Sequence, residues 1–323
     1  MGQTDRAVVC LGAAAVDMMF TVDKLPEADE MVFAKGEPGF FAGGSTANIA
    51  AGIGRLGCKS RFVGRVGKDE NGRRLRRAFE ADGVDARWLA EIEGGRTAQT
   101  IIAVDQSGDR VIYSLGGEAI LLEPDEFDDA AMEDAQVLYM GEVFPHVADR
   151  AIRAARSCGA TVVYGPGGGI SWMDGETLGR LLRSCDYVLL SRGELGAVTS
   201  CSTPAEGAER LLESGVRNVV VTLGPDGSEC HFRVGDVNGG AHCQRNRKAV
   251  RVEAFRIAEA VDTTGAGDSF AAGFITGLLE EMDLAECLLR GNACAALAIQ
   301  KIGAREAMPT ARELEEFLQN AER

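Results

Sequence analysis

The residues best suited to chemistry form a short polar segment near the C-terminus, Val261-Asp-Thr-Thr-Gly-Ala-Gly-Asp-Ser-Phe270. Apolar residues recur at helical spacing after Asp268, so the segment is a glycine-containing turn that runs into a helix. Gly265, Ala266 and Gly267 would present their backbone N–H groups at the N-terminus of this helix, which attracts anions. Asp268 adds a carboxylate that could take a proton from a hydroxyl, which predicts phosphoryl transfer to an alcohol. The same aspartate is also consistent with a simple helix cap.

A second candidate site lies near the N-terminus. Gly43 and Gly44 precede a predicted helix start, where glycine lets a ligand approach the backbone closely. Asn48, four residues after Gly44, offers both a donor and an acceptor, which suits vicinal hydroxyls. Asp17 follows the first apolar run, and an aspartate just past a strand of an α/β sheet is placed to reach a ligand. A turn-forming role for Asp17 is equally consistent with the sequence.

The elements that must position these residues alternate between strand and helix patterns throughout the chain, which predicts βα units around a mainly parallel sheet. The runs 97–104 and 110–115 are rich in β-formers and are joined by Asp105-Gln-Ser-Gly-Asp109, which is a hairpin signal. Together with residues 18–36 they predict a small sheet that covers the site. Three helices are expected after the polar segment, beginning near 266, 284 and 310.

Two other phosphate-binding motifs are excluded. Gly52-x-Gly54-x-x-Gly57 matches a dinucleotide fingerprint, but it lies at the end of a helical run rather than between a strand and a helix. This placement excludes a nicotinamide-dependent dehydrogenase. No G-x-x-x-x-G-K-[ST] sequence is present, so the chain is not a P-loop kinase.

Composition narrows the class of protein. The 323 residues are 46% hydrophobic and carry a net charge of −15, which argues against nucleic acid as a partner. The nine cysteines are odd in number and show no C-x-x-C spacing, and the three histidines have no zinc spacing. The first apolar run, 7–16, is too short to span a membrane and is flanked by Asp5 and Asp17, so it is no signal peptide. A cytoplasmic protein with no membrane partner is expected.

The two motifs resemble signatures of the ribokinase-like (PfkB) family of carbohydrate and nucleoside kinases. Asp262 to Phe270 resembles the C-terminal signature, and Gly43-Gly44-x-x-x-Asn48 resembles the N-terminal sugar-binding motif. The resemblance implies one domain over residues 1–323. Its fold would be a three-layer α/β/α sandwich with a mainly parallel central sheet and a small β lid formed by about 14–38 and 95–118. It also implies ATP-dependent phosphorylation of a hydroxymethyl group of a sugar.

The resemblance further implies roles for individual residues. Asp268 would be the base, and the amides of Gly265, Ala266 and Gly267 would form the anion hole. The sugar would be held by Asp17, Gly43, Gly44, Asn48 and Glu142. The nucleotide would be held by Ser191, Thr222, Gly224, Gly227 and Asn292. Glu194 would organise Mg²⁺ through water, and a monovalent cation such as K⁺ would lie at Asp262, Thr264, Ala298, Lys301 and Gly303.

The sequence also departs from the family in ways that leave the substrate open. Ser191 replaces the usual Asn, Gly116 to Ala119 differs from the common Gly-Ala-Asn-Ala, and Gly165 to Gly169 replaces Asp-x-Asn. The stretch Gln244 to Lys248 is a predicted insertion, and the role of the basic residues over 244–251 is left open. A nucleoside kinase in which Phe40 and Phe41 stack on a base is one alternative, and a non-catalytic sugar or nucleoside sensor is another. Relatives often pair through the lid, which predicts a homodimer.

Overall fold

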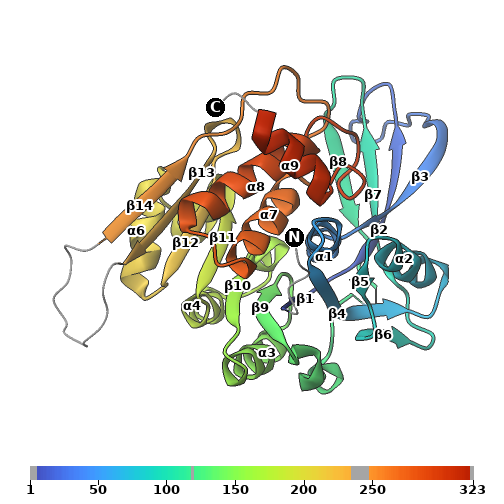
Figure 1. Cartoon of the computed structure of the whole chain (residues 1–323). Helices are drawn as coiled ribbons and strands as arrows, with labels where there is room; N and C mark the ends of the chain where they lie inside the picture. Colours follow the sequence, from blue (N-terminus) through green and yellow to red (C-terminus); the bar gives the residue numbers. More distant parts are fainter. Residues whose placement is uncertain (1–5, 118–119, 234–246, 321–323) are drawn as a thin grey trace.

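The computed structural model describes residues 6–117, 120–233 and 247–320, and its main body is built on a ten-stranded sheet (Figure 1). The strand order is β14-β13-β12-β11-β10-β9-β1-β4-β5, with β6 also paired to β4. The strands pair in parallel except that β13 runs antiparallel to both of its neighbours. Their bounds are β1 Ala7–Leu11, β4 Lys59–Gly67, β5 Val84–Asp85, β6 Leu89–Ile92, β9 Ala135–Met140, β10 Thr161–Tyr164, β11 Tyr187–Ser191, β12 Asn218–Thr222, β13 Ser228–Arg233 and β14 Arg247–Val252.

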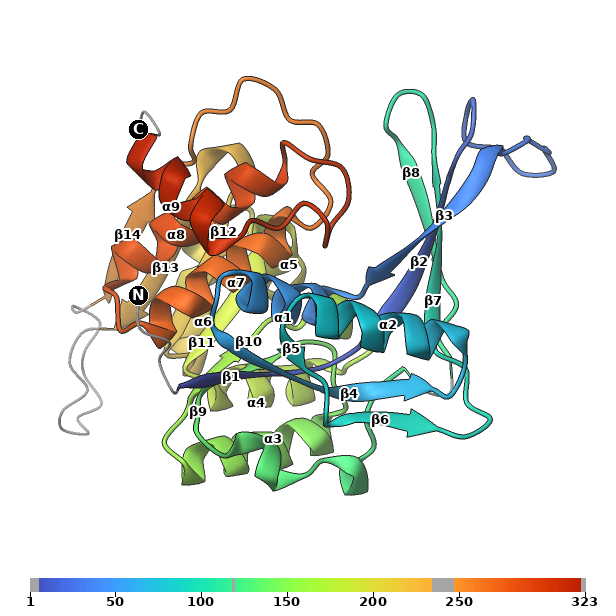
Figure 2. The same ribbon diagram turned by 45° about the vertical axis from the view of Figure 1, so that its right-hand side comes forward.

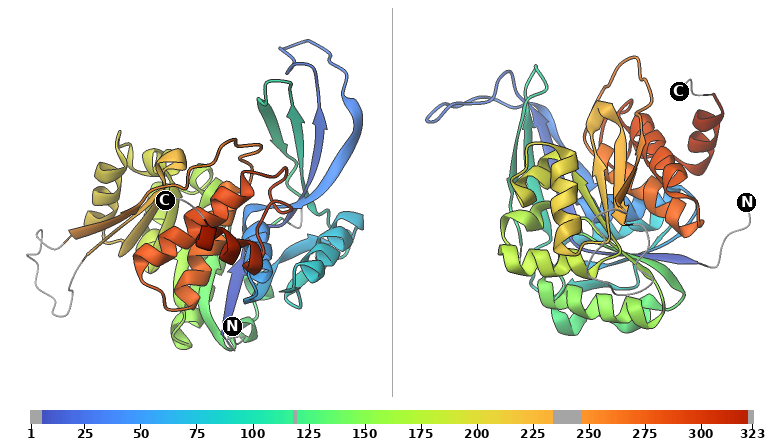
Figure 3. Two further views of the ribbon diagram at one scale, coloured as in Figure 1. Left: turned by 45° about the horizontal axis from the view of Figure 1, so that its top comes forward. Right: turned by 90° about the vertical axis from the view of Figure 1, so that its left-hand side faces the viewer.

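Helices cover both faces of this sheet, as the right-hand view of Figure 3 shows. Alternate residues of a strand point to opposite faces, and in β1 Val9 packs into the core on one side while Val8 packs into the core on the other. The first face is covered by α3 Pro145–Ser157, α4 Gly175–Ser184, α5 Arg192–Thr199 and α6 Pro204–Ser214. The second is covered by α1 Ser45–Arg55, α2 Glu70–Ala81, α7 Ala266–Leu279, α8 Leu284–Ala298 and α9 Ala311–Asn320. This arrangement confirms the expected three-layer α/β/α sandwich.

A separate four-stranded sheet, which we call the small sheet, stands out from the main body (Figure 2). Its order is β3-β2-β7-β8, with bounds β2 Ala15–Thr21, β3 Lys35–Gly43, β7 Ala98–Val104 and β8 Arg110–Ser114. The predicted hairpin joins β7 to β8. In its turn the carboxylate of Asp105 accepts hydrogen bonds from the backbone N–H groups of Ser107 and Asp109, at 2.9 and 3.1 Å. This local bonding fixes the turn that the sequence Asp-Gln-Ser-Gly-Asp predicts.

The strand order locates the place where a ligand can bind. β1 lies between β4 and β9, so the chain continues to opposite sides of β1 in its two halves. The crevice outside the carboxyl ends of such strands is where open α/β sheets bind their ligands. Gly141 and Glu142 follow β9 at this crevice, and the small sheet begins soon after β1. The topology therefore gathers the candidate residues from distant parts of the chain.

A buried ion pair fixes the loop between α8 and α9. The Arg305 side chain is 3% exposed, donates to Asp82 at the end of α2 at 2.7 Å, and stacks over Phe79 with its guanidinium 4.7 Å from the ring centre. Arg55 at the end of α1 donates to the carbonyl oxygen of Arg305 at 3.0 Å. Removing one partner of a buried ion pair leaves the other charge buried without compensation, which is strongly destabilising. The pair therefore holds the loop and the end of α2 in fixed positions. The loop held in this way also carries Gly303 and Ala304, which contact the turn before α7.

The region after β12 forms the antiparallel pair of β13 and β14, and residues 253–260 form no strand. Several of them line a cavity instead, as described below. Glu118, Ala119 and residues 244–246 of the predicted insertion lie outside the described residues, so the expectations for them are untested. No helix in the described part of the chain is long and apolar enough to cross a membrane.

Candidate functional site

The polar segment forms the predicted turn into α7. Gly265 is the N-cap of this helix in a left-handed conformation with φ of 75°. A side chain at this position would put a Cβ 2.7 Å from the Cα of Ala304, so both the backbone angle and the packing require glycine. A Cβ added at Gly267 would meet no atom within 4 Å, so this residue faces open space. The N–H of Ala266 donates to the Thr263 carbonyl at 3.3 Å, which holds the turn closed.

Asp268 lies in the first turn of α7 and is held from α1. Its two carboxylate oxygens accept hydrogen bonds from the Ser45 hydroxyl at 2.6 Å and from the Asn48 side-chain amide at 2.9 Å. Burial raises the pKa of Asp268 to about 6, with those two hydrogen bonds opposing the rise and the charges of Glu142 and Asp17 adding to it. The carboxylate is therefore oriented, ionised at neutral pH, and more basic than an ordinary aspartate.

Ser45 was not among the residues predicted from the sequence. It is the first residue of α1 and directly follows Gly43 and Gly44. A hydroxyl at the start of a helix beside a predicted ligand site was therefore the available signal. Asn48 was predicted to bind a ligand, and the structure adds that its amide nitrogen orients Asp268. Its amide oxygen is buried and has no hydrogen-bond partner among the described residues, which leaves an acceptor for a ligand hydroxyl.

Asp17 lies within β2 of the small sheet rather than in a loop after β1. Its carboxylate accepts a hydrogen bond from the Thr100 hydroxyl on β7 at 2.5 Å. A Cβ at Gly43 would lie 2.1 Å from the same carboxylate, so glycine at position 43 makes room for Asp17. Burial raises the pKa of Asp17, against the effect of the Thr100 bond, and the charge of Glu306 adds to the rise. The small sheet thus supplies one wall of the site.

Glu142 follows β9, and the glycine-rich loop after β10 wraps around it. The Glu142 carboxylate accepts a hydrogen bond from the backbone N–H of Gly168 at 3.2 Å, and a Cβ at Gly167 would lie 2.6 Å from the same oxygen. The run Gly165 to Gly169, unexplained by the sequence, therefore allows the backbone to close on a buried carboxylate. Burial raises the pKa of Glu142, and the charge of Glu194 contributes.

A cavity of about 150 Å³ adjoins Asp268 and Gly267 and is lined also by Ser191 and Glu194. Ser191 and Glu194 form a capping box at the start of α5: the Ser191 N–H donates to Glu194 at 2.7 Å, and the Glu194 N–H donates to the Ser191 hydroxyl at 3.2 Å. The Ser191 side chain is therefore used as a helix cap. Among the described residues no group of three or more His, Cys, Asp or Glu is arranged to hold a metal directly.

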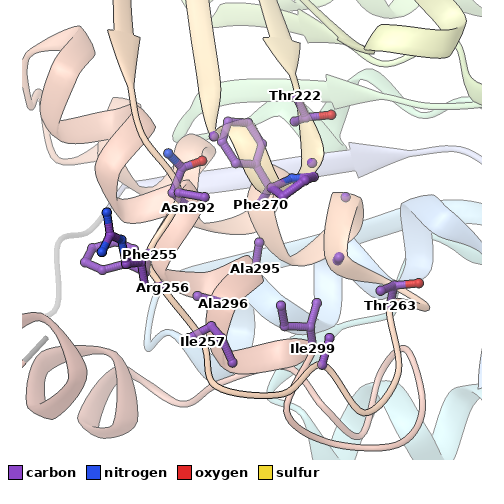
Figure 4. Close-up of a pocket in the computed structure, with 17 residues that line it drawn as sticks. Thr222, Phe255, Arg256, Ile257, Thr263, Phe270, Asn292, Ala295, Ala296 and Ile299 are labelled. Carbon is purple, nitrogen blue, oxygen red and sulfur yellow. The ribbon is translucent and has the colours of Figure 1, made fainter. Parts of the chain in front are cut away.

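A larger cavity of about 710 Å³ lies on the other side of Gly267 (Figure 4). Its walls are mostly apolar and include Phe255, Ile257, Phe270 and Ile299, which suits a flat ring. The predicted nucleotide residues Thr222, Gly224, Gly227 and Asn292 all line it. The Asn292 amide nitrogen donates to the carbonyls of Val252 and Glu253 at 3.1 and 3.2 Å, which fixes the chain after β14 as a cavity wall.

The residues expected at a monovalent cation site also meet. The carboxylate of Asp262 accepts hydrogen bonds from the N–H groups of Thr264 and Gly303, both at 2.9 Å. Partial burial opposes the change, but these bonds and the charge of Arg110 lower the pKa of Asp262. Lys301 donates its backbone N–H to the Ala298 carbonyl at 3.1 Å, and its ammonium group pairs with Glu313. Asp262 therefore joins the turn before α7 to the loop after α8.

The chain is similar to known proteins along nearly its whole length. The sequence profile of the family described as "pfkB family carbohydrate kinase" matches residues 5–311. An ATP-dependent ribose-1-phosphate kinase of Halopiger xanaduensis is 33% identical over 96% of this chain and 97% of its own length. A probable chloroplastic fructokinase-6 of Arabidopsis thaliana is 29% identical over 99% of this chain and 84% of its own length.

A solved structure of Arabidopsis thaliana ribokinase with ribose and ATP superposes with a TM-score of 0.83 at 26% identity. The superposition covers 97% of this chain and 98% of the other. These matches span the small sheet, both motifs and both cavities, so the site described above belongs to the part of the chain that is shared with the relatives.

Replacing each of the two glycines of the turn by alanine should affect stability differently. Gly265→Ala should lower the free energy of unfolding by about 1–3 kcal/mol, because alanine is strained at this φ and its Cβ meets Ala304. Gly267→Ala should leave it unchanged or raise it by up to about 1 kcal/mol, because the position is helical and its Cβ meets nothing. Urea unfolding of both variants measures the difference. Equal stability of the two would contradict this account of the turn.

Proposed function

We propose, from the premise that the chain belongs to the pfkB family of carbohydrate kinases, that this ATP-dependent sugar kinase phosphorylates a hydroxymethyl group of its substrate. The observation that carries the proposal is the placement of Asp268. It is oriented by Ser45 and Asn48 at the N-terminus of α7, and Gly267 beside it faces both cavities. Asp268 lies between an apolar cavity suited to a nucleotide and a group of carboxylates suited to sugar hydroxyls. Phosphoryl transfer to an alcohol needs a base in such a position, because the base must take the proton of the attacking hydroxyl.

The substrate's other hydroxyls would be held by Asp17, Glu142 and Asn48. Two of these are carboxylates, which when ionised can accept hydrogen bonds but not donate them, and the third has an unpartnered buried oxygen. Hydroxyl donors would satisfy all three. Asp268 would take the proton of the hydroxymethyl group, and the positive N-terminus of α7 at Gly265, Ala266 and Gly267 would stabilise the negative charge of the transferred group.

The residues present also fit ATP and Mg²⁺. The apolar walls around Phe255 and Phe270 suit adenine, and the open position at Gly267 leaves room for phosphate at a helix N-terminus. Glu194 lines the cavity beside Asp268, and carboxylate oxygen, with water, is what Mg²⁺ prefers. Mg²⁺ supplies charge neutralisation of the phosphates when it is bound. K⁺ at Asp262, Thr264, Ala298, Lys301 and Gly303 is proposed as well, with Asp262 as its charged neighbour.

Neutral sugars are the favoured substrates. The charges of Glu142 and Asp17 both raise the pKa of Asp268, so three carboxylates share the substrate end of the site and would repel an anionic substrate. The ribose-1-phosphate kinase relative makes a sugar phosphate the necessary counter-test. A nucleoside is the second candidate. Phe41 pairs with Asp17 and so lies on its face of the small sheet, whereas Phe40 contacts Arg74 with 5.5 Å between the guanidinium and the ring centre.

A coupled ADP-release assay tests the proposed function. With ATP, Mg²⁺ and K⁺, we expect turnover of a pentose or a hexose in preference to nucleosides and to the two anions of the panel, a 2-keto-3-deoxy acid and ribose 1-phosphate. Asp268→Asn should lower turnover by about 10²–10⁴-fold because it removes the base, while ATP binding stays close to wild type. Near-normal turnover of this variant would rule out the assigned base. Binding of ATP without turnover of any substrate would favour the sensor.

The pKa of Asp268 predicts the pH dependence of turnover. The folded protein raises this pKa to about 6, so the carboxyl holds a proton below that pH and cannot accept another. We therefore expect kcat/KM with the preferred sugar to be constant above about pH 7 and to fall tenfold per pH unit well below 6. Ser45→Ala removes a hydrogen bond that favours the ionised form, so it should move the acid limb to higher pH. An acid limb near pH 4 in the wild type would contradict the raised pKa.

We also propose that two copies pair through the small sheet. Large apolar side chains are exposed on the small sheet and on the segment between β2 and β3: Met31 and Phe33 in that segment, Phe40 in β3, Ile112 and Tyr113 in β8 and Leu115 directly after it, at 78, 79, 43, 53, 61 and 50%. Exposed apolar side chains gathered in one part of a fold favour an interaction surface, and a second copy of the sheet offers matching ones. The cytoplasmic location expected from the sequence remains a prediction.

Light scattering at micromolar concentration should therefore give the mass of a dimer. Tyr113→Asp should shift the protein to a monomer, because it places a charge among the exposed apolar side chains, whereas Tyr113→Phe should leave the dimer intact. A monomeric wild type would contradict pairing through the small sheet.

A further inference from the structure

The tip of the small sheet contacts the turn before α7. Arg110 is the first residue of β8, directly after the hairpin turn, and its guanidinium donates to the Thr264 hydroxyl at 2.5 Å. Thr264 immediately precedes Gly265, the N-cap of the helix that carries Asp268. A cation on a separate sheet is thus bonded to the segment where the phosphates are proposed to bind.

A polar cavity of about 480 Å³ lies at this contact. Gly108, Asp109 and Arg110 line it from the small sheet, and residues 260–263 line it from the other side. Ala260 and Thr263 also line the large cavity proposed for the nucleotide. The hairpin tip and the nucleotide cavity therefore share a wall, and Arg110 lies at the end of that wall where α7 begins.

Few positively charged side chains lie at the catalytic end of the site, by which we mean the region around Asp268 and the start of α7. Of the described residues that line the nucleotide cavity and the cavity beside Asp268, Arg256 is the only cation. Figure 4 shows Arg256 beside Phe255, at the opposite end of the nucleotide cavity from Thr263. The carboxylates of Asp268 and Glu194 are at the catalytic end. A phosphoryl group carries negative charge on its outer oxygens during transfer, so this end needs a cation of the protein's own beside Mg²⁺.

The guanidinium of Arg110 is suited to that role. It has five N–H donors in a planar fork, and among the described residues it donates one hydrogen bond, to the neutral hydroxyl of Thr264. Phosphate oxygens are stronger acceptors for this fork than a hydroxyl, since the bonds are assisted by charge on both sides. The charge of Arg110 helps to lower the pKa of the nearby Asp262, but the carboxylate of Asp262 accepts its hydrogen bonds from the N–H groups of Thr264 and Gly303.

We propose that Arg110 is a further catalytic residue, whose guanidinium binds the γ-phosphoryl group as it is transferred. This inference rests on the proposed function. Asp268 takes the proton of the sugar hydroxyl while its oxygen bonds to phosphorus and the bond from phosphorus to the ADP oxygen breaks. Arg110 keeps all its protons and contributes charge and hydrogen bonds. The small sheet then supplies a catalytic group as well as cover, so its position controls the chemistry directly.

The test compares Arg110→Ala and Arg110→Lys with Lys35→Ala, which removes another exposed cation of the small sheet. Calorimetric titration with Mg²⁺ measures binding of ADP and of a non-hydrolysable ATP analogue. Arg110→Ala should weaken the analogue about tenfold or more, the loss of a charge-assisted hydrogen bond, while ADP binding changes less than about twofold. Its kcat should fall by about 10²–10³-fold, as for other groups that stabilise transition-state charge. Arg110→Lys should restore part of both losses, and Lys35→Ala should match the wild type.

A second comparison separates contact with phosphate from ordering of the turn. If Arg110 acted only through Thr264, Arg110→Ala would cost nothing further in a Thr264→Val background. We expect it to weaken the analogue by the same factor in both backgrounds. Equal analogue-to-ADP preference in wild type and Arg110→Ala would overturn the inference. A wild type that turns over no sugar would instead contradict the proposed function, and the binding preference would still decide the role of Arg110.

Discussion

The pair of hydrogen bonds from Ser45 and Asn48 to Asp268 is the interaction on which the site depends. It joins the start of α1 to the start of α7, two helices more than two hundred residues apart that pack side by side on one face of the sheet. Since both helices begin at the same crevice, the motif proposed to bind the sugar and the motif proposed to bind phosphate become one site. The bonds also fix the direction of a buried carboxylate that would otherwise be free to rotate.

Close approach of backbone to side chain is the second constraint. Gly43 leaves room for the carboxylate of Asp17, Gly167 leaves room for that of Glu142, and Gly265 leaves room for Ala304. Each contact would be blocked by a single Cβ. Burial raises the pKa of Asp17, Glu142 and Asp268, and neighbouring carboxylate charges add to the effect. The packing that forms the walls of the site therefore also makes Asp268 more basic than an ordinary aspartate.

The small sheet and the C-terminal loop complete the site from opposite sides. The small sheet brings Asp17, with Thr100 to hold it, and its hairpin tip brings Arg110 to Thr264. The loop after α8 is anchored by the buried pair of Arg305 and Asp82 and presses Ala304 against the turn. Movement of either element would change the geometry at the N-terminus of α7. Substrate binding, charge and turn conformation are therefore coupled through packing.

The sequence by itself determined the βα units around a mainly parallel sheet, the helix that starts near 266 and the residues of both motifs. Periodicity sets the elements, and the resemblance of the two motifs to a known family implied the three-layer arrangement. It did not identify Ser45, Thr100 or Arg110 as partners, or explain the glycines at 165–169. Those roles depend on contacts between residues tens to hundreds of positions apart, and periodicity carries no information about such pairs. Only the tertiary structure decided which carboxylate is buried, what it bonds to, and hence that the pKa of Asp268 is about 6.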